Sequence, residues 1–139
     1  MITKTNIIKN IHQILQPEIR AINALIKDSS HPDEALIGII SDHLINSGGK
    51  RLRPILVILS AKLFGYIGEK HLDLAAAVEF IHAATLLHDD VVDESNLRRQ
   101  ANTANFIWGN KASILVGDFL LSQAFKLMVK TESLQCLHI

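Results

Sequence analysis

The sequence predicts an all-α protein. Apolar residues recur at spacings of three and four along most of the chain, which is the helical period. No segment shows the strict alternation of apolar and polar residues that is typical of a half-buried strand. With 139 residues, of which 48% are hydrophobic and 20% are charged, the chain is long and apolar enough for one helical domain with its own core.

The apolar spacing predicts five helices. They cover residues 3–27, 34–46, 54–63, 71–92 and 111–130. Pro17 can kink the first of them, because a proline inside a helix removes a hydrogen bond. The polar segment 94–103 indicates a loop, and Thr103 can cap a short turn that ends at Trp108.

The boundaries of the middle helices depend on residues that start or stop a helix. Asp33 can cap the second helix, and the segment 47–49, Ser-Gly-Gly, can end it. Pro54 suits the first turn of the third helix, since a proline there loses no hydrogen bond. Gly65 can end that third helix.

The composition excludes several classes of protein. The 14 basic and 14 acidic residues cancel, so no overall charge favours nucleic acid or an acidic membrane surface as a partner. A single cysteine, Cys136, rules out an internal disulfide and fits a reducing compartment, so we expect a cytoplasmic protein. No uncharged apolar run of about 18 residues occurs, and none follows Lys4 and Lys9, so neither a transmembrane helix nor a cleaved signal peptide is expected.

The stretch Glu79–Arg99 holds the principal candidate site. Its helix is apolar nearly all round, yet it places Asp89, Asp90 and Asp93 at its C-terminal end, where the helix dipole disfavours carboxylates. Since His82, Asp89 and Asp93 are separated by seven and four positions, they fall within roughly 20° of one line along the helix, with Asp90 rotated to the side. Carboxylate oxygens are ligands that Mg²⁺ prefers, so this face predicts a magnesium site.

Two basic clusters accompany the acidic one. Arg98 and Arg99 follow it, and paired guanidinium groups suit phosphate. In the segment GGKRLRP (48–54), Lys50 and Arg53 are three apart and point the same way on a helix start, while the glycines let the backbone approach a ligand. Together these clusters predict a site for two diphosphates, one held through magnesium and one held directly. The alternative is a set of solvated surface charges.

Several of these segments resemble one known family, the trans-polyprenyl diphosphate synthases, which include farnesyl and geranylgeranyl diphosphate synthases. The matching segments are GGKRLRP at 48–54, EFIHAATLLHDDVVDES at 79–95, RR at 98–99 and WGNKASILVGDFLLSQAF at 108–125. The chain resembles the N-terminal half of a long-chain, octaprenyl-type member that makes quinone side chains, and the motifs cover most of it from about Ile39 onward. This resemblance implies an isoprenoid-synthase-type helical bundle, present as a single partial domain over residues 1–139.

The resemblance also implies a role for each matching residue. The segment 89–93 is similar to the family's first aspartate-rich motif, DDxxD. Asp89 and Asp93 would bind the Mg²⁺ ions that hold the allylic diphosphate, Asp90 would support them, and Arg98 would contact that diphosphate. Isopentenyl diphosphate would be held by Lys50, Arg53, His82 and Arg99. The implied reaction is a head-to-tail condensation, in which the allylic C–O bond ionises, the isopentenyl double bond attacks the cation, and a proton is lost.

Small residues about one turn before Asp89 predict a long product. Ala84 and Thr85 lie there, on or near the same face of the helix. The growing tail would leave the metal site along this helix, and family members that stop at short chains resemble this pattern but place aromatic rings there. Small residues would leave the tunnel open. The alternative is that Ala84 packs closely against a neighbouring helix.

Three features depart from the family's pattern. Gln100 stands where a glycine usually follows the paired arginines, and Asn102 stands where proline or alanine is common. The sequence also contains no second aspartate-rich motif before its end at Ile139. We therefore expect a truncated reading frame or one piece of a split protein, inactive alone, that forms a homodimer or associates with a missing C-terminal half.

Two other functions remain open. One is a non-catalytic helical subunit of a split enzyme. The other is a metal-dependent phosphohydrolase, because His88-Asp89 resembles the His-Asp pair of that class. That class needs further histidine ligands, and the candidates His43 and His71 share no helix face with the pair.

Overall fold

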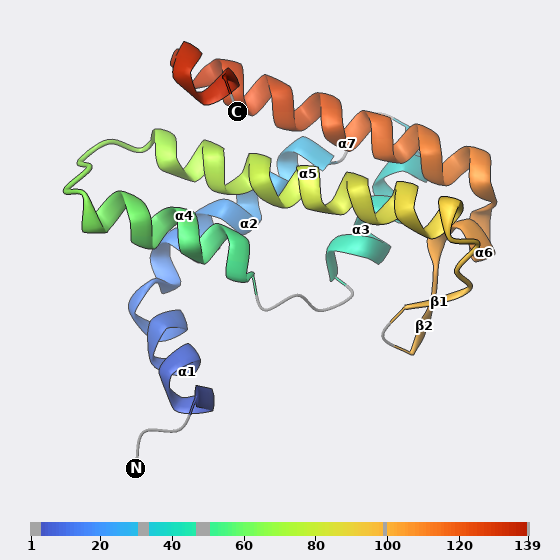
Figure 1. Ribbon diagram of the computed structural model, residues 1–139, viewed down its shortest axis with the longest axis horizontal. Helices are drawn as coiled ribbons and strands as arrows, with labels where there is room; N and C mark the ends of the chain where they lie inside the picture. The colour runs from blue at the N-terminus through green and yellow to red at the C-terminus, as the bar shows by residue number, and fades with distance from the viewer. Residues whose placement is uncertain (1–3, 31–33, 47–50, 99, 139) are drawn as a thin grey trace.

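Helices make up nearly all the regular structure of the computed structural model (Figure 1), so the all-α prediction is confirmed. The structure describes residues 4–30, 34–46, 51–98 and 100–138, so the predicted cap Asp33 and the predicted stop at 47–49 lie outside the described residues. The elements are α1 (Lys4–Ile14), α2 (Gln16–Ser30), α3 (Ala35–Asn46), α4 (Leu52–Leu63), α5 (Lys70–Val92), β1 (Leu97–Arg98), β2 (Ala101–Asn102), α6 (Ala104–Trp108), α7 (Asn110–Lys130) and a 3-10 turn, η1 (Leu134–Leu137).

α5 is the central helix, with α7 running along one side of it and α4 along another (Figure 1). Its core face consists mostly of alanines, which let the neighbouring helices approach closely. The buried apolar residues of α5 are Ala75, Ala76, Ala77, Phe80, Ala83, Ala84 and Leu87. α7 also has a row of buried apolar residues, which are Val116, Leu120, Ala124 and Leu127. The end of α5 that carries the candidate site therefore belongs to the most extensively packed pair of helices among the described residues.

The first predicted helix is two helices in the structure, and the expectation of one kinked helix was wrong in this respect. α1 ends at Ile14 and α2 begins at Gln16. Pro17 lies in the first turn of α2, where its missing N–H costs no intrahelical hydrogen bond. Hydrogen bonds Leu15 N–Ile11 O and Ile19 N–Leu15 O, both 2.9 Å, continue across the junction. Leu15 itself is buried, so the break anchors the chain in the core.

The segment predicted as a plain loop contains a small hairpin, which is a second correction. β1 and β2 pair antiparallel, with Leu97 opposite Asn102 and Arg98 opposite Ala101. Strands of two residues are too short to show alternation, so no sequence pattern could indicate them. The predicted short turn after Thr103 is α6. The Thr103 hydroxyl makes no cap hydrogen bond and instead donates to the Ser95 carbonyl at 2.7 Å.

One helix of the described residues, α7, is long and apolar enough to cross a membrane, judged by length and composition alone. It has 21 residues, and an 18-residue window within it has a mean hydropathy of 1.5. It is also the main partner of α5 in the bundle, and core helices meet the same two criteria. The expectation that the chain lacks a transmembrane helix thus receives only weak support.

Candidate functional site

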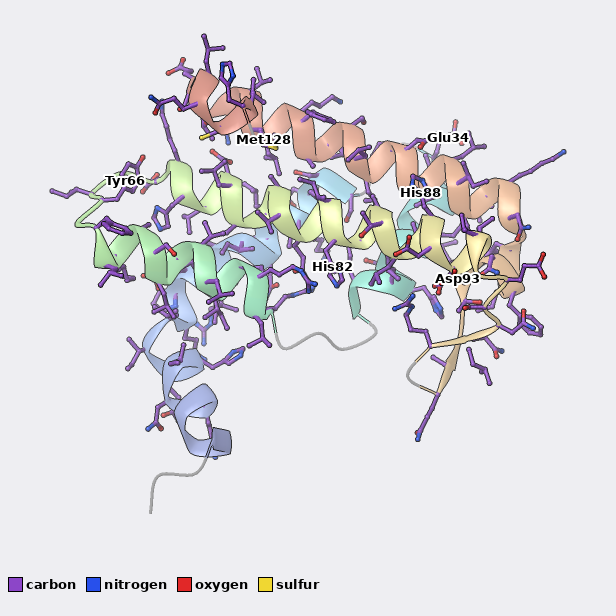
Figure 2. All side chains as sticks on the ribbon, viewed as in Figure 1. Glu34, Tyr66, His82, His88, Asp93 and Met128 are labelled. Carbon is purple, nitrogen blue, oxygen red and sulfur yellow. The ribbon has the colours of Figure 1, made fainter. Side chains whose placement is uncertain are left out.

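The acidic end of α5 separates three carboxylates by exposure. Asp89 and Asp93 are exposed, whereas Asp90 is 3% exposed. The helical period explains this: Asp89 and Asp93 are four apart and share the outer face, and Asp90 is turned about 100° toward the interior. Figure 2 shows Asp93 and His82 on the side of α5 turned away from α7. The predicted line of His82, Asp89 and Asp93 agrees with this arrangement.

Asp90 holds Arg98, which lies on β1 eight residues later. Arg98 Nε donates to both carboxylate oxygens at 3.2 Å, and Nη2 donates to Oδ1 at 2.8 Å. This hydrogen bonding raises the pKa of the Arg98 guanidinium; the charges of Asp90, Asp89 and Asp93 add to it, and partial burial opposes it. The Arg98 guanidinium therefore stays protonated and is held beside the face that carries Asp89 and Asp93.

A hydrogen-bond network fixes the loop between α5 and the hairpin, and the sequence did not indicate it. Ser95 N donates to the Asp90 carbonyl at 2.9 Å. Asn105 on α6 reaches back with its side-chain amide to the carbonyls of Asp90, at 3.2 Å, and Ser95, at 3.0 Å. Asn105 carries no local signal that marks it, because its partners lie ten and fifteen positions away. The network therefore fixes the direction in which the chain runs from the end of α5 to Arg98 on β1.

Of the four residues predicted to hold the second diphosphate, His82 and Arg53 come from two antiparallel helices. His82 is half-buried on α5, and Arg53 is exposed in the first turn of α4. Because α4 and α5 form a helical hairpin, the start of α4 lies beside the middle of α5 (Figure 1). Lys50 and Arg99 lie outside the described residues, so their predicted roles stay predictions.

His88 does not face the acidic surface. It lies between α5 and α7 (Figure 2), where Nε2 is 3.3 Å from the Ile114 carbonyl and 3.4 Å from Asp118 Oδ1. Gly117 makes room for the imidazole, because a Cβ at that position would collide with the ring. His43 contacts Trp108 instead. Among the described residues, no group of three or more His, Cys, Asp or Glu could hold a metal, so the histidines of the phosphohydrolase alternative are not gathered.

The two predicted chain-length residues lie in different surroundings. Thr85 is exposed, on the same side of α5 as Asp89, and its hydroxyl donates to the His82 carbonyl at 2.8 Å. Ala84 is 1% exposed and belongs to the core. Thr85 therefore borders the acidic face directly, and Ala84 packs behind it.

The donor set at the end of α5 fits magnesium together with a phosphate. Asp89 and Asp93 are separated by one helical turn, about 6 Å along the axis. Mg²⁺ is commonly held by one or two carboxylates while waters and substrate phosphates complete its shell. Asp89 and Asp93 would hold such an ion, and Arg98 beside them would suit a phosphate group.

Comparison with known proteins identifies the family. The family model described as polyprenyl synthetase matches residues 34–139. The octaprenyl diphosphate synthase of Escherichia coli K12 is 43% identical over 132 residues, which cover 95% of this chain and 41% of that protein. An octaprenyl diphosphate synthase of Haemophilus influenzae is 44% identical over 132 residues, covering 95% of this chain and 40% of that protein. The chain thus spans about 40% of the length of these curated relatives.

Solved structures share the fold. The polyprenyl synthase of Caulobacter crescentus CB15, crystallised with calcium and isoprenyl diphosphate, superposes with a TM-score of 0.90 at 47% identity, covering 94% of this chain and 40% of that one. A decaprenyl diphosphate synthase of Rhodobacter capsulatus gives a TM-score of 0.88 at 48% identity, covering 92% and 40%. The resemblance read from the motifs is confirmed, and the chain belongs to the polyprenyl synthetase family.

Proposed function

We propose that this chain carries the diphosphate-binding part of a trans-prenyltransferase that condenses isopentenyl diphosphate with an allylic diphosphate. The observation that carries the proposal is the end of α5, where Asp89 and Asp93 are exposed on one face while buried Asp90 holds Arg98 beside them. Relatives named as octaprenyl, nonaprenyl and decaprenyl diphosphate synthases support a long-chain product.

Each residue at the acidic end has a separate task in this proposal. Asp89 and Asp93 hold Mg²⁺, which when bound neutralises charge on the leaving diphosphate. Arg98 is already oriented by Asp90 through Nε and Nη2, so its Nη1 is the group that donates to a phosphate oxygen of the allylic substrate. Because Asp90 is buried and engaged, we assign it to holding Arg98 rather than to the metal.

The second diphosphate is assigned to the middle of α5. His82 lies seven residues before Asp89, about 10 Å along the helix axis, which leaves room for a separate anion. Arg53 at the start of α4, with Lys50 and Arg99, completes the proposed isopentenyl diphosphate site.

Calorimetric titration tests the metal-dependent half of the proposal. The unaltered chain should bind an allylic diphosphate only when magnesium is present, and Asp89→Ala together with Asp93→Ala should abolish binding. Asp28→Ala removes an exposed carboxylate on α2 and serves as the matched control. Equal binding with and without magnesium would refute the assignment.

The product length is proposed to depend on Thr85 and Ala84. In an enzyme restored to full length with the C-terminal half of a close relative, Thr85→Phe and Ala84→Phe should shorten the product, read by chromatography. Thr85→Phe is the cleaner test, since Thr85 is exposed, whereas a ring at buried Ala84 also overpacks the core. An unchanged long product from both variants would contradict the assignment.

We further propose that residues 1–139 form one partial domain of a cytoplasmic enzyme, acting as a homodimer or with a C-terminal half. The 139 residues contain one aspartate-rich motif, so the chain alone should show little or no prenyl transfer. Robust turnover by the purified chain without a partner would contradict this.

A second candidate function is a non-catalytic subunit of a split synthase. A stripe of exposed leucines on α4 favours it, because large apolar side chains in one row commonly mark a contact surface. The stripe consists of Leu52, Leu56, Leu59 and Leu63. Mixing the chain with a separately produced C-terminal half should then restore turnover even after Asp89→Ala, whereas loss of turnover in that variant supports the enzymatic role.

A further inference from the structure

Arg51 is the one described cation of the segment 48–54 that turns inward. Its Nη1 lies 2.6 Å from Glu79 Oε1 on α5, with side-chain exposures of 16% for Arg51 and 11% for Glu79. Its Nη2 donates to the carbonyl of Ile45 near the end of α3, at 3.2 Å. One guanidinium thus joins three helices: the start of α4, the middle of α5 and the end of α3.

The backbone of Arg51 is held in an unfavourable conformation. Its φ of 49° and ψ of 34° place it in the left-handed region, at the cap position before α4. A residue with a side chain is strained in this region, and such a conformation persists only where surrounding contacts determine it. The Arg51 carbonyl accepts the hydrogen bond from Ile55 N at 3.0 Å that opens α4. The ion pair therefore fixes both the side chain and the turn that directs α4.

The position of Glu79 connects this anchor to the proposed diphosphate site. Glu79 lies three residues before His82, so the two side chains are one helical turn apart on α5. Arg53 follows Arg51 by two positions in the first turn of α4. The Arg51–Glu79 contact consequently fixes the start of α4, which carries Arg53, relative to α5, which carries His82.

We propose that Arg51 is a positioning residue: its ion pair with Glu79 holds Arg53 and His82 on one diphosphate, and Arg51 itself does not bind that anion. This inference rests on the proposed function. Its electrostatic consequence is specific. Glu79 is a negative charge near an anion site, so its removal alone should strengthen anion binding, whereas loss of positioning should weaken it. The two effects have opposite signs.

The test measures the affinity of the 139-residue chain for inorganic pyrophosphate and for isopentenyl diphosphate by calorimetry. Glu79→Leu and Arg51→Met should each weaken binding about tenfold, and the double variant should be no weaker than either single one, because both remove one contact. Arg51→Lys keeps the charge but loses the fork that also reaches the Ile45 carbonyl, so its affinity should be intermediate. Tighter binding by Glu79→Leu would overturn the inference. It would mean either that Arg51, once freed from Glu79, binds the anion itself, or that the negative charge of Glu79 affects affinity more than the position of Arg53 does.

A matched pair separates positioning from general stability. Lys130→Met breaks the ion pair between Lys130 and Asp73, 3.0 Å apart, at the other end of α5. It should lower the melting temperature as the Arg51 variants do, yet leave both affinities unchanged. Equal loss of affinity in Lys130→Met would overturn the inference. All titrations are made at a temperature where circular dichroism shows each variant folded.

The proposed function and the inference fail in different ways. If the unaltered chain binds neither anion, both fail. If it binds, and Arg53→Ala and His82→Ala weaken binding while Glu79→Leu does not, the proposed site stands and the positioning role of Arg51 is refuted.

Discussion

The two side chains of the Asp90–Arg98 ion pair differ in exposure, and this difference predicts that their removal has unequal effects on stability. The Asp90 side chain is 4% exposed and that of Arg98 is 37% exposed. Removing Arg98 leaves a buried carboxylate without this partner, whereas removing the charge of Asp90 leaves a guanidinium that water can still reach. The cost of breaking the pair should therefore depend on which partner is removed.

The magnitudes follow from burial. Breaking a fully buried ion pair costs about 3–5 kcal/mol, so Arg98→Met should cost about 3 kcal/mol, at the low end because water can enter where Arg98 was partly exposed. Asp90→Asn keeps one acceptor oxygen but replaces the other with an NH2 group that cannot accept from Arg98, so it loses one hydrogen bond from Nε as well as the charge assistance, about 1–2 kcal/mol. With a urea slope of about 1–3 kcal/mol per molar, Arg98→Met should lower the unfolding midpoint by roughly 1–3 M.

Urea unfolding followed by far-UV circular dichroism measures both variants. Glu132→Gln breaks the exposed pair with Lys70, whose side chains are 82% and 49% exposed, and should cost under about 1 kcal/mol as a control. The double variant Asp90→Asn with Arg98→Met should cost less than the sum of the singles. A larger loss for Asp90→Asn than for Arg98→Met would refute the reasoning.

Three further predictions concern stability. Gly117→Ala should displace the His88 ring from α7 and cost about 1–3 kcal/mol in thermal unfolding, and combining it with His88→Ala should recover part of that loss. Gln100 has a φ of 69°, so Gln100→Gly should stabilise the chain by about 0.5–1 kcal/mol, while Gln100→Ala, which keeps a Cβ, should not. The hydrogen bond from Lys62 holds the pKa of Glu18 below its ordinary 4.5, so the pair stabilises the fold above that pH and ceases to as pH falls through the lowered pKa. Glu18→Gln should therefore cost under about 1 kcal/mol at pH 6, and this cost should shrink as the pH falls below 4.5 and through the lowered pKa; a cost that does not fall with pH would contradict the prediction.

Local residue patterns predict most of the helices and the face of α5 on which Asp89 and Asp93 lie. Asp89 and Asp93 belong to one helix, so their relative direction follows from the helical period once the helix is recognised. The same helical period predicts that Asp90 points to the side of this face, and in the structure its side chain is buried. The positions of α4, α5 and α7 followed from apolar spacing and from Pro54 and Gly65. They could be predicted because the start and the end of a helix depend on residues that are close together in the sequence.

The contacts between groups far apart in the sequence could be read only from the folded structure. Arg98 and Arg51 are both arginines beside motif residues, and no local signal shows that one faces Asp90 and the other Glu79, 28 positions away. His88 is adjacent to Asp89 in sequence, yet it turns to α7 because Gly117 leaves room for its ring. The β1–β2 hairpin could not be predicted from the sequence either, because strands of two residues are too short to show an alternating pattern. Contacts of this kind depend on how the helices pack and not on the order of neighbouring residues, and that packing sets which groups Arg51 and Asp90 contact.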